Sequence, residues 1–402
     1  TSSRGETRVG LIVIDLTGGS PKALRAATFS DSDITQFDWV SDDRLVFSVV
    51  DLQEGSGEDM YYASGLFAVD PDGSSLRRLV SREGSANSVD GRMLKWNHTL
   101  LAVPQQQEGV RPDEVVIGEM YFSHKTVTSI TPKWLNVRSG KTRSMDADPP
   151  DGAVGWEFDS KGEPRIAYSR VGGKAATHWR GPGDKQWRQL TKDNLLEAKF
   201  SPEAVDDAGN LYVTQINAKS GFSELSLFDF NTGKPNTAPL LVTPGFDFTG
   251  SMVMGRPGTR ALGVRVVTDA EQTVWLDEGM KRVQAMVDAQ LPGRVNRISC
   301  RRCGADDSVL LVRSFSDRDP GKLYHYEAAS KRWNLVGNVQ DDLDPQRMGR
   351  VAIHRIKARD GRDLPVWLTQ PAGLKPGQPV PAVVLVHGGC WQKSIADRTL
   401  MN

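Results

Sequence analysis

Near the end of the 402-residue chain, a histidine and two glycines directly follow an apolar run. The run is Ala382–Val386, and His387, Gly388 and Gly389 come next. Glycine lets the backbone approach a ligand with no Cβ in the way, and backbone N–H groups held near a developing negative charge form an oxyanion hole. A tight turn after a strand would use the same glycines. The sequence therefore predicts either an oxyanion-hole region at these three residues or a simple turn.

The residues before the glycines predict the strands that would position them. Val351–Ile356 alternates between apolar and polar residues, Ala358–Gly361 supplies a turn, and Leu364–Leu368 returns as a second arm. Pro371–Pro381 is a connection rich in Pro and Gly. The continuous apolar run Ala382–Val386 is typical of a strand buried on both faces. We expect an antiparallel hairpin followed by a buried strand that ends at the glycines.

Upstream of residue 345, seven segments share one design, in which an alternating apolar run ends at a polar residue and a turn rich in Gly, Asn or Ser. The spacing of these polar residues runs from 42 (138 to 180) to 68 (70 to 138). Such a period marks a repeat architecture, and strands with turns favour a β-propeller over a helical solenoid. The polar residues are Asp15, Asp70, Arg138, Arg180, Asp229, Asp277 and Glu327.

A second strand pair precedes most of these hairpins, so each repeat predicts a four-stranded blade. The hairpin that ends at Asp15 has no such pair before it. We therefore expect the chain to open inside a blade and the propeller to have about seven blades, within the known range of four to eight. The fold class expected is mainly β, with a propeller over residues 1–345 whose first blade is incomplete.

One segment departs from the β pattern. Its apolar residues recur at helical spacing, Asp277 is placed to cap the helix, and Pro292-Gly293 would end it. We expect a short amphipathic helix packed on a blade edge, with a partner-binding helix as the alternative. The apolar residues are Met280, Val283, Met286, Val287 and Leu291.

Four tryptophans occupy predicted strand positions. Large aromatic side chains at such positions are usually buried. We expect all four to lie in the core between blades. They are Trp39, Trp156, Trp179 and Trp187.

The chain has three cysteines, and Cys300 and Cys303 have the spacing of a redox or zinc motif. A structural zinc site needs four ligands, and no second pair of Cys or His is nearby. A thioredoxin-like site would need a βαβ setting, whereas this stretch lies between strand-like runs. A local disulfide and two ordinary thiols both remain open, and we expect no metal and no cofactor.

Bulk composition narrows the choice of partners. The 50 basic and 50 acidic residues leave no net charge, which argues against a nucleic acid or an anionic membrane as partner. No window is long and apolar enough to suggest a membrane span. The chain begins at Thr1 with no signal peptide, which says little about compartment. We favour a periplasmic or secreted location over a cytoplasmic one. Oligomeric state is left open.

Several motifs resemble one known family. Lys357–Gly361, Leu364–Pro371 and Val384–Gly389 resemble the start of the hydrolase domain in the prolyl oligopeptidase family of serine peptidases, which includes dipeptidyl and acylaminoacyl peptidases. Phe315–Gly321 and Trp39–Phe47 resemble the propeller of that family. Its members carry a β-propeller ahead of an α/β-hydrolase domain, which is the order found here.

The resemblance implies that residues 346–402 are the N-terminal strands of a truncated α/β-hydrolase (peptidase) domain. Two features depart from the family pattern. Cys390 stands where the family usually has Pro after His-Gly-Gly, and Gln392–Asn402 does not continue the pattern.

The function implied is serine-type hydrolysis of short peptides, with the propeller restricting access. The nucleophile motif Gly-x-Ser-x-Gly occurs nowhere in the chain. The resemblance therefore implies that the catalytic Ser, Asp and His lie beyond Asn402, and that this chain by itself is inactive. His387 would belong to the oxyanion turn and not to the triad. The alternatives are a non-catalytic propeller that serves as a binding scaffold and an esterase of the same hydrolase fold.

Overall fold

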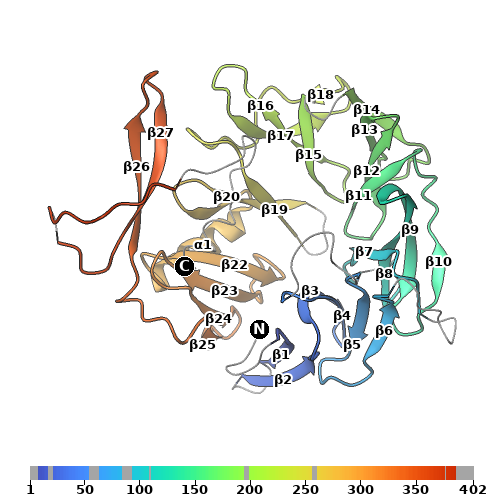
Figure 1. The fold of residues 1–402 in the computed structure, drawn as a ribbon, viewed down its shortest axis with the longest axis horizontal. Helices are drawn as coiled ribbons and strands as arrows, with labels where there is room; N and C mark the ends of the chain where they lie inside the picture. The colour runs from blue at the N-terminus through green and yellow to red at the C-terminus, as the bar shows by residue number, and fades with distance from the viewer. Residues whose placement is uncertain are drawn as a thin grey trace. The chain divides into compact units, whose positions relative to one another are not determined.

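The computed structural model describes residues 8–16, 21–53, 63–83, 93–107, 110–193, 199–255, 260–375 and 377–385. Within these ranges the chain forms 27 strands and one helix (Figure 1). It divides into two compact units. The first is Thr1–Gln215 with Ser226–Ala238 and Pro257–Arg260, and the second is Ile216–Leu225 with Pro239–Arg256 and Ala261–Asn402.

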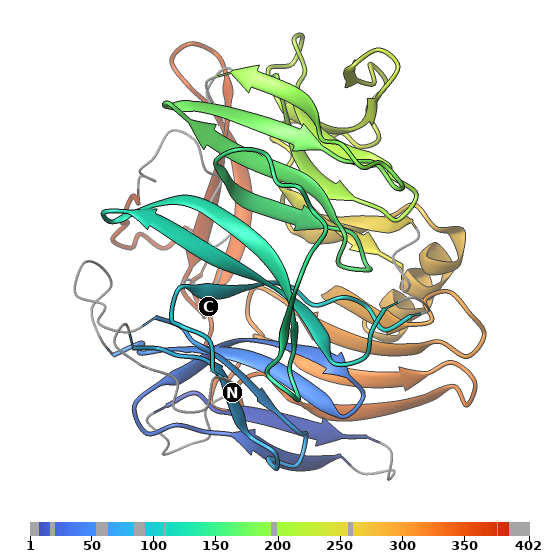
Figure 2. The ribbon, with the colours of Figure 1, turned by 90° about the vertical axis from the view of Figure 1, so that its right-hand side faces the viewer.

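Four four-stranded antiparallel sheets follow the first two strands, each built from consecutive strands as in the blades of a propeller. The first sheet is β3 (Asp33–Ser41), β4 (Arg44–Val50), β5 (Leu66–Val69) and β6 (Arg77–Val80). The second is β7 (His98–Ala102), β8 (Glu114–Ser123), β9 (Thr126–Asn136) and β10 (Thr142–Ser144), in which β8 and β9 form a long hairpin, teal in Figure 2. The third is β11 (Ala153–Phe158), β12 (Pro164–Val171), β13 (Lys174–Trp179) and β14 (Arg188–Asp193). The fourth is β15 (Phe200–Val205), β16 (Leu211–Ile216), β17 (Ser223–Asp229) and β18 (Lys234–Pro235).

Two further sheets follow the same order. One has three strands, β19 (Gly250–Met254), β20 (Ala261–Val267) and β21 (Glu271–Trp275). The other has four, β22 (Val295–Arg301), β23 (Val309–Phe315), β24 (Lys322–Glu327) and β25 (Arg332–Asn338). Two separate pairs complete the set, β1 (Leu11–Asp15) with β2 (Lys22–Ala27), and β26 (Arg350–Lys357) with β27 (Asp363–Gln370).

The described residues thus contain six blades, and the expectation of about seven is wrong. The hairpin whose first strand ends at Asp15 forms only the two-stranded β1–β2 sheet. A hairpin marks a blade only when an inner strand pair precedes it in the same sheet. The repeat pattern registers hairpins and not whole sheets, so the count from the sequence included one too many.

The middle strands of the blades are buried on both faces. In β4, Val46 packs into a cluster with Val115 and Ile117 of the next sheet, while Leu45 and Phe47 pack into another cluster on the opposite face. Successive side chains of a strand point to opposite faces, so one strand supplies both clusters. Each fully buried apolar side chain stabilises the fold by about 1.5–3 kcal/mol.

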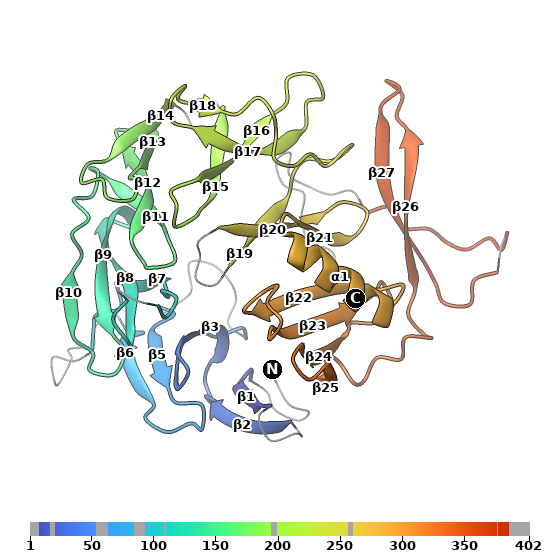
Figure 3. The same ribbon diagram turned by 180° about the vertical axis from the view of Figure 1, so that it is seen from behind.

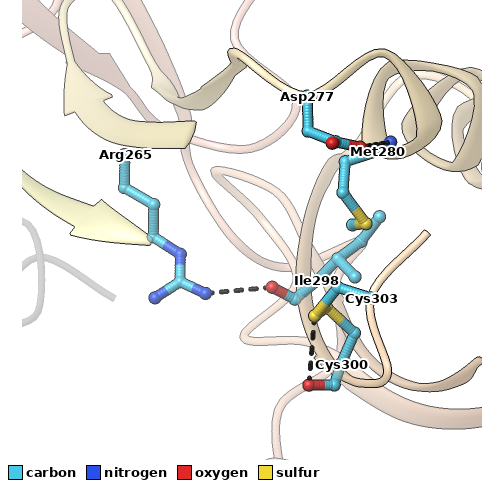
Figure 4. Close-up of a disulfide and its surroundings, with 6 residues drawn as sticks. All are labelled: Arg265, Asp277, Met280, Ile298, Cys300 and Cys303. Carbon is cyan, nitrogen blue, oxygen red and sulfur yellow. Dashed lines mark hydrogen bonds between the residues drawn. A yellow bond between two sulfur atoms is a disulfide. The ribbon is translucent and has the colours of Figure 1, made fainter. Parts of the chain in front are cut away.

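The predicted helix is confirmed. It is α1 (Glu278–Gln290), and the Asp277 side chain caps it by accepting a hydrogen bond from the Met280 N–H at 3.0 Å (Figure 4). Met280 and Val287 are fully buried in a cluster with Ile298 of β22, so the helix packs on a blade as expected. Among the described residues, no helix is long and apolar enough to cross a lipid bilayer.

The tryptophan prediction is confirmed for Trp179 and only in part for Trp156 and Trp187. Trp179 is buried. Trp156 and Trp187 are half-buried, pack edge to face with ring centroids 5.6 Å apart, and each donates its indole N–H to a backbone carbonyl 2.8 Å away. Trp39 is 47% exposed, so its predicted burial is wrong. It lies on β3, the terminal strand of its sheet, beside which the described residues place no further strand.

Of the hairpin and the buried strand expected near the C-terminal end, the first is confirmed and the second is wrong. The hairpin is confirmed, since β26 and β27 pair from Arg350↔Gln370 to Lys357↔Asp363. The buried strand is wrong: residues 382–385 form no strand, and Val383–Leu385 are 80–88% exposed. An apolar strand is buried only between neighbouring strands and covering helices, and none pairs with this segment in the described part of the chain. The domain boundary at residue 345 stays a prediction.

Replacing Phe47 with Ala tests the two-sided burial of β4. Phe47 is fully buried and stacks on Phe67 at 5.4 Å, so the loss should be about 3–5 kcal/mol of unfolding free energy. The matched control is Phe37→Ala, since Phe37 pairs directly with Phe47 across β3 and β4 but is 56% exposed. Its cost should stay within about 0.5 kcal/mol. Urea unfolding measures both, and equal costs would contradict the assignment.

Candidate functional site

The residues predicted to form the oxyanion-hole region, His387, Gly388 and Gly389, lie outside the described residues. The last described residue before them is Leu385. Their role therefore stays a prediction from the sequence.

The two open readings of the Cys300 and Cys303 pair are decided by the structure. The two residues form a disulfide, with Cα atoms 5.3 Å apart, at the end of β22 and beside the helix (Figure 4). In the residues that the structure describes, no three side chains of His, Cys, Asp or Glu are grouped so that they could hold a metal ion.

The terminal strands of four blades share an irregularity that the sequence did not reveal. β3, β7, β11 and β15 each lie at one end of their sheet (Figure 3). Each contains at least one residue that has no partner on the neighbouring strand, which is the pattern of a β-bulge. The bulged residues are Thr35, Leu101, Val154 and Glu203. Bulges redirect side chains and often accompany functional sites.

Two carboxylates interact electrostatically near one of these bulges. Glu157 on β11 accepts a hydrogen bond from the Tyr168 hydroxyl at 2.5 Å. Glu203, the bulged residue of β15, accepts one from the Thr214 hydroxyl at 3.1 Å. The acids come from the terminal strands of two consecutive blades and interact electrostatically. We call Glu157, Tyr168, Glu203 and Thr214 the acidic cluster.

The surroundings disfavour negative charge in the acidic cluster. Burial raises the pKa of Glu157, and the hydrogen bond from Tyr168 opposes this only in part. Burial also raises the pKa of Glu203, with a further rise from the charge of Glu157. Solvent reaches Glu203, yet protein surrounds it closely enough to weaken its hydration. Burial and the charge of Glu157 raise the pKa of the Tyr168 hydroxyl as well.

This arrangement suits proton exchange or binding of a cationic group. Carboxylates with raised pKa values are candidates for acid–base work, and a positive charge between two of them would relieve their repulsion. The hydroxyls of Tyr168 and Thr214 already donate to the carboxylates. The acidic cluster is therefore a candidate binding or proton-exchange site.

A second polar pair has the chemistry of a nucleophile and its base. The Ser169 hydroxyl lies 2.8 Å from Nε2 of His178, within the range of such pairs. Ser169 is buried inside its sheet, however, and burial lowers the pKa of His178. Within the described residues, no carboxylate bonds to this imidazole to orient it. We interpret the pair as a polar contact that stabilises the blade.

No protein-family profile matches the sequence, and no curated protein matches it. Among solved structures, the chain is similar to one from a structural and mechanistic study of two prolyl endopeptidases, at 15% identity and TM-score 0.51, over 89% of this chain and 50% of that one. Lower scores relate it to prolyl oligopeptidase B from Galerina marginata (10% identity, TM-score 0.47, 89% and 50% coverage) and to a puromycin-hydrolyzing peptidase of Mycobacterium tuberculosis (15%, 0.47, 93% and 56%). The chain spans about half the length of these proteins. The likeness to the prolyl endopeptidase is one of fold alone.

Replacing Glu157 with Gln tests the electrostatic cost of the acidic cluster. A raised pKa means that the folded state holds the proton more tightly than the unfolded state does. The contribution of Glu157 to stability is therefore full below its unfolded pKa of about 4.3 and is lost as pH rises through the folded pKa. The Gln side chain of the variant cannot ionise, so the variant does not lose stability as pH rises. Its melting temperature should exceed that of the parent by about 2 °C at pH 7 and by less at pH 4.

Thermal unfolding between pH 4 and 8 measures this difference. Glu83→Gln is the control, since Glu83 is exposed in the same unit, and it should show no such rise. A Glu157→Gln variant that is less stable than the parent at every pH would refute the electrostatic interpretation.

Proposed function

We propose that this chain is the propeller-bearing part of a serine peptidase of the prolyl oligopeptidase type that hydrolyses short peptides. The observation that carries the proposal is the order of parts along the chain. Propeller blades end at Asn338, the β26–β27 hairpin follows, and the sequence then reaches His387-Gly388-Gly389. The fold likeness to a prolyl endopeptidase supports it.

The reaction would be acyl transfer. A Ser hydroxyl, activated by His, attacks the peptide carbonyl, and backbone N–H groups near Gly388 and Gly389 stabilise the negative oxygen of the intermediate. Because Gly-x-Ser-x-Gly is absent from these 402 residues, the nucleophile would be supplied by further sequence of the parent protein. The propeller would exclude large substrates, so that only short peptides reach the catalytic Ser.

Comparing residues 1–402 with the protein of the complete reading frame tests the proposal. The longer protein should hydrolyse aminoacyl or Pro-containing chromogenic peptides and react with a fluorophosphonate. Residues 1–402 should do neither, since loss of a whole triad costs about a millionfold in rate.

Other results of this comparison would favour an alternative function or contradict the assignment of the triad. A complete protein that binds no fluorophosphonate would favour the non-catalytic scaffold. Hydrolysis of esters without hydrolysis of peptides would favour the esterase. Fluorophosphonate-sensitive turnover by residues 1–402 would show that the nucleophile lies within them and would contradict the assignment of the triad.

Replacing Gly389 with Val in the complete protein tests the predicted oxyanion-hole region. A side chain there would hinder the approach of the backbone to the substrate, and loss of one donor lowers kcat about 100- to 1000-fold. KM should change little, because the interaction forms in the transition state. Gly337→Ala is the control, since a Cβ at Gly337 meets no atom within 4 Å. Unchanged kcat in Gly389→Val would favour a simple turn.

A further inference from the structure

A cavity of about 500 Å³ lies between two strands of the first unit. Its walls are residues 35–38 of β3 and residues 100–103, which belong to β7 and the residue after it. The volume falls within the range of 300–1,000 Å³ that is usual for ligand-binding sites. We call this cavity the β3–β7 groove.

The lining residues show whether the groove follows a face or an edge of the two strands. Side chains alternate between the two faces of a strand, so a cavity over one face would be lined by every second residue. The β3–β7 groove is lined by four consecutive residues on each strand. It therefore runs along the strand edges, where the backbone N–H and C=O groups point.

β3 and β7 are the terminal strands of their sheets, and no described strand other than β4 and β8 pairs with residues 35–38 or 100–103. The edge of β3 is bonded just outside the groove, where the Ile34 N–H donates to the Val9 carbonyl at 3.0 Å. Each strand carries a bulge inside the groove. Thr35 has no partner on β4, and Leu101 has none on β8. A bulge interrupts the regular ladder of hydrogen bonds at the extra residue. The regular pairing within each sheet is thus broken at the place where the groove lies.

The side chains of the groove suit an amphipathic segment. On β3, the residues from Thr35 to Trp39 are all exposed, and they include the large apolar ring of Phe37. On the other wall, Leu100–Val103 is apolar and half-buried. Neither wall contributes Lys or Arg to the lining, which disfavours a nucleic acid.

We propose that the β3–β7 groove binds an extended peptide segment of about four residues. The peptide pairs its backbone with a strand edge, as in β-augmentation, and four residues of strand span about 13 Å. Its apolar side chains lie against Phe37 and Leu100–Val103. The proposal rests on the proposed function only for the identity of the peptide as substrate or product of the parent enzyme; the binding itself needs no catalytic residue.

Binding of a blocked tetrapeptide, Ac-Leu-Ser-Leu-Ser-NH2, to residues 1–402 tests the proposal. Calorimetry should detect binding at micromolar to millimolar concentration, and hydrogen exchange should slow at residues 35–38 and 100–103. The same peptide with both Ser nitrogens methylated loses two donors and should bind about tenfold more weakly. No binding at millimolar peptide, protection elsewhere, or equal affinity of the methylated peptide would overturn the proposal.

Phe37→Ala separates the groove from other sites. Phe37 is exposed, so the variant should fold normally and bind the tetrapeptide about tenfold more weakly, through loss of apolar contact. Leu76→Ala is the matched control, since Leu76 is 51% exposed and lies outside the groove; its affinity should equal that of the parent. Unchanged affinity in Phe37→Ala would overturn the proposal. Because residues 1–402 are expected to lack turnover, these results do not depend on peptidase activity.

Discussion

Burial of the middle strands on both faces is the constraint on which the rest of this structure depends. Residues of β4 supply two separate apolar clusters, with Val46 on one face and Phe47 on the other. Such strands have no room for solvated polar chemistry, because a buried polar group is costly unless it is hydrogen-bonded. The Ser169–His178 contact illustrates this, since the buried Ser169 hydroxyl is satisfied by the half-buried His178 and the contact therefore stabilises its blade. The two carboxylates of the acidic cluster and both walls of the β3–β7 groove lie on terminal strands.

The terminal strands contain β-bulges at both candidate sites. At Thr35 and Leu101 the bulges interrupt pairing along the β3–β7 groove, and at Glu203 a bulge accompanies the electrostatic interaction of two carboxylates. In both cases the interacting residues are far apart in the sequence and come from consecutive blades. In the acidic cluster only Glu203 is a bulged residue, whereas the β3–β7 groove contains a bulge on each wall.

The residues after the blades show the same dependence on neighbours. The β26–β27 hairpin forms from local information, since a turn at Asp360-Gly361 joins two strands that satisfy each other. The apolar run that follows is exposed, because a strand with two apolar faces needs strands beside it and helices over it. Its apolar character indicates a place in a sheet, and the described residues provide no partner for it there.

The sequence by itself determined the features that depend on local order. The spacing of polar residues indicated a repeated sheet, Asp277 and the apolar periodicity indicated α1, and the turn at Asp360-Gly361 indicated a hairpin. Tertiary structure alone decided the number of blades, the exposure of Trp39, the bulges and the electrostatic interaction between Glu157 and Glu203. The physical reason is that hairpins and helices are stabilised by residues a few positions apart, whereas blade closure, strand edges and clusters of charge depend on residues that only the folded chain brings together.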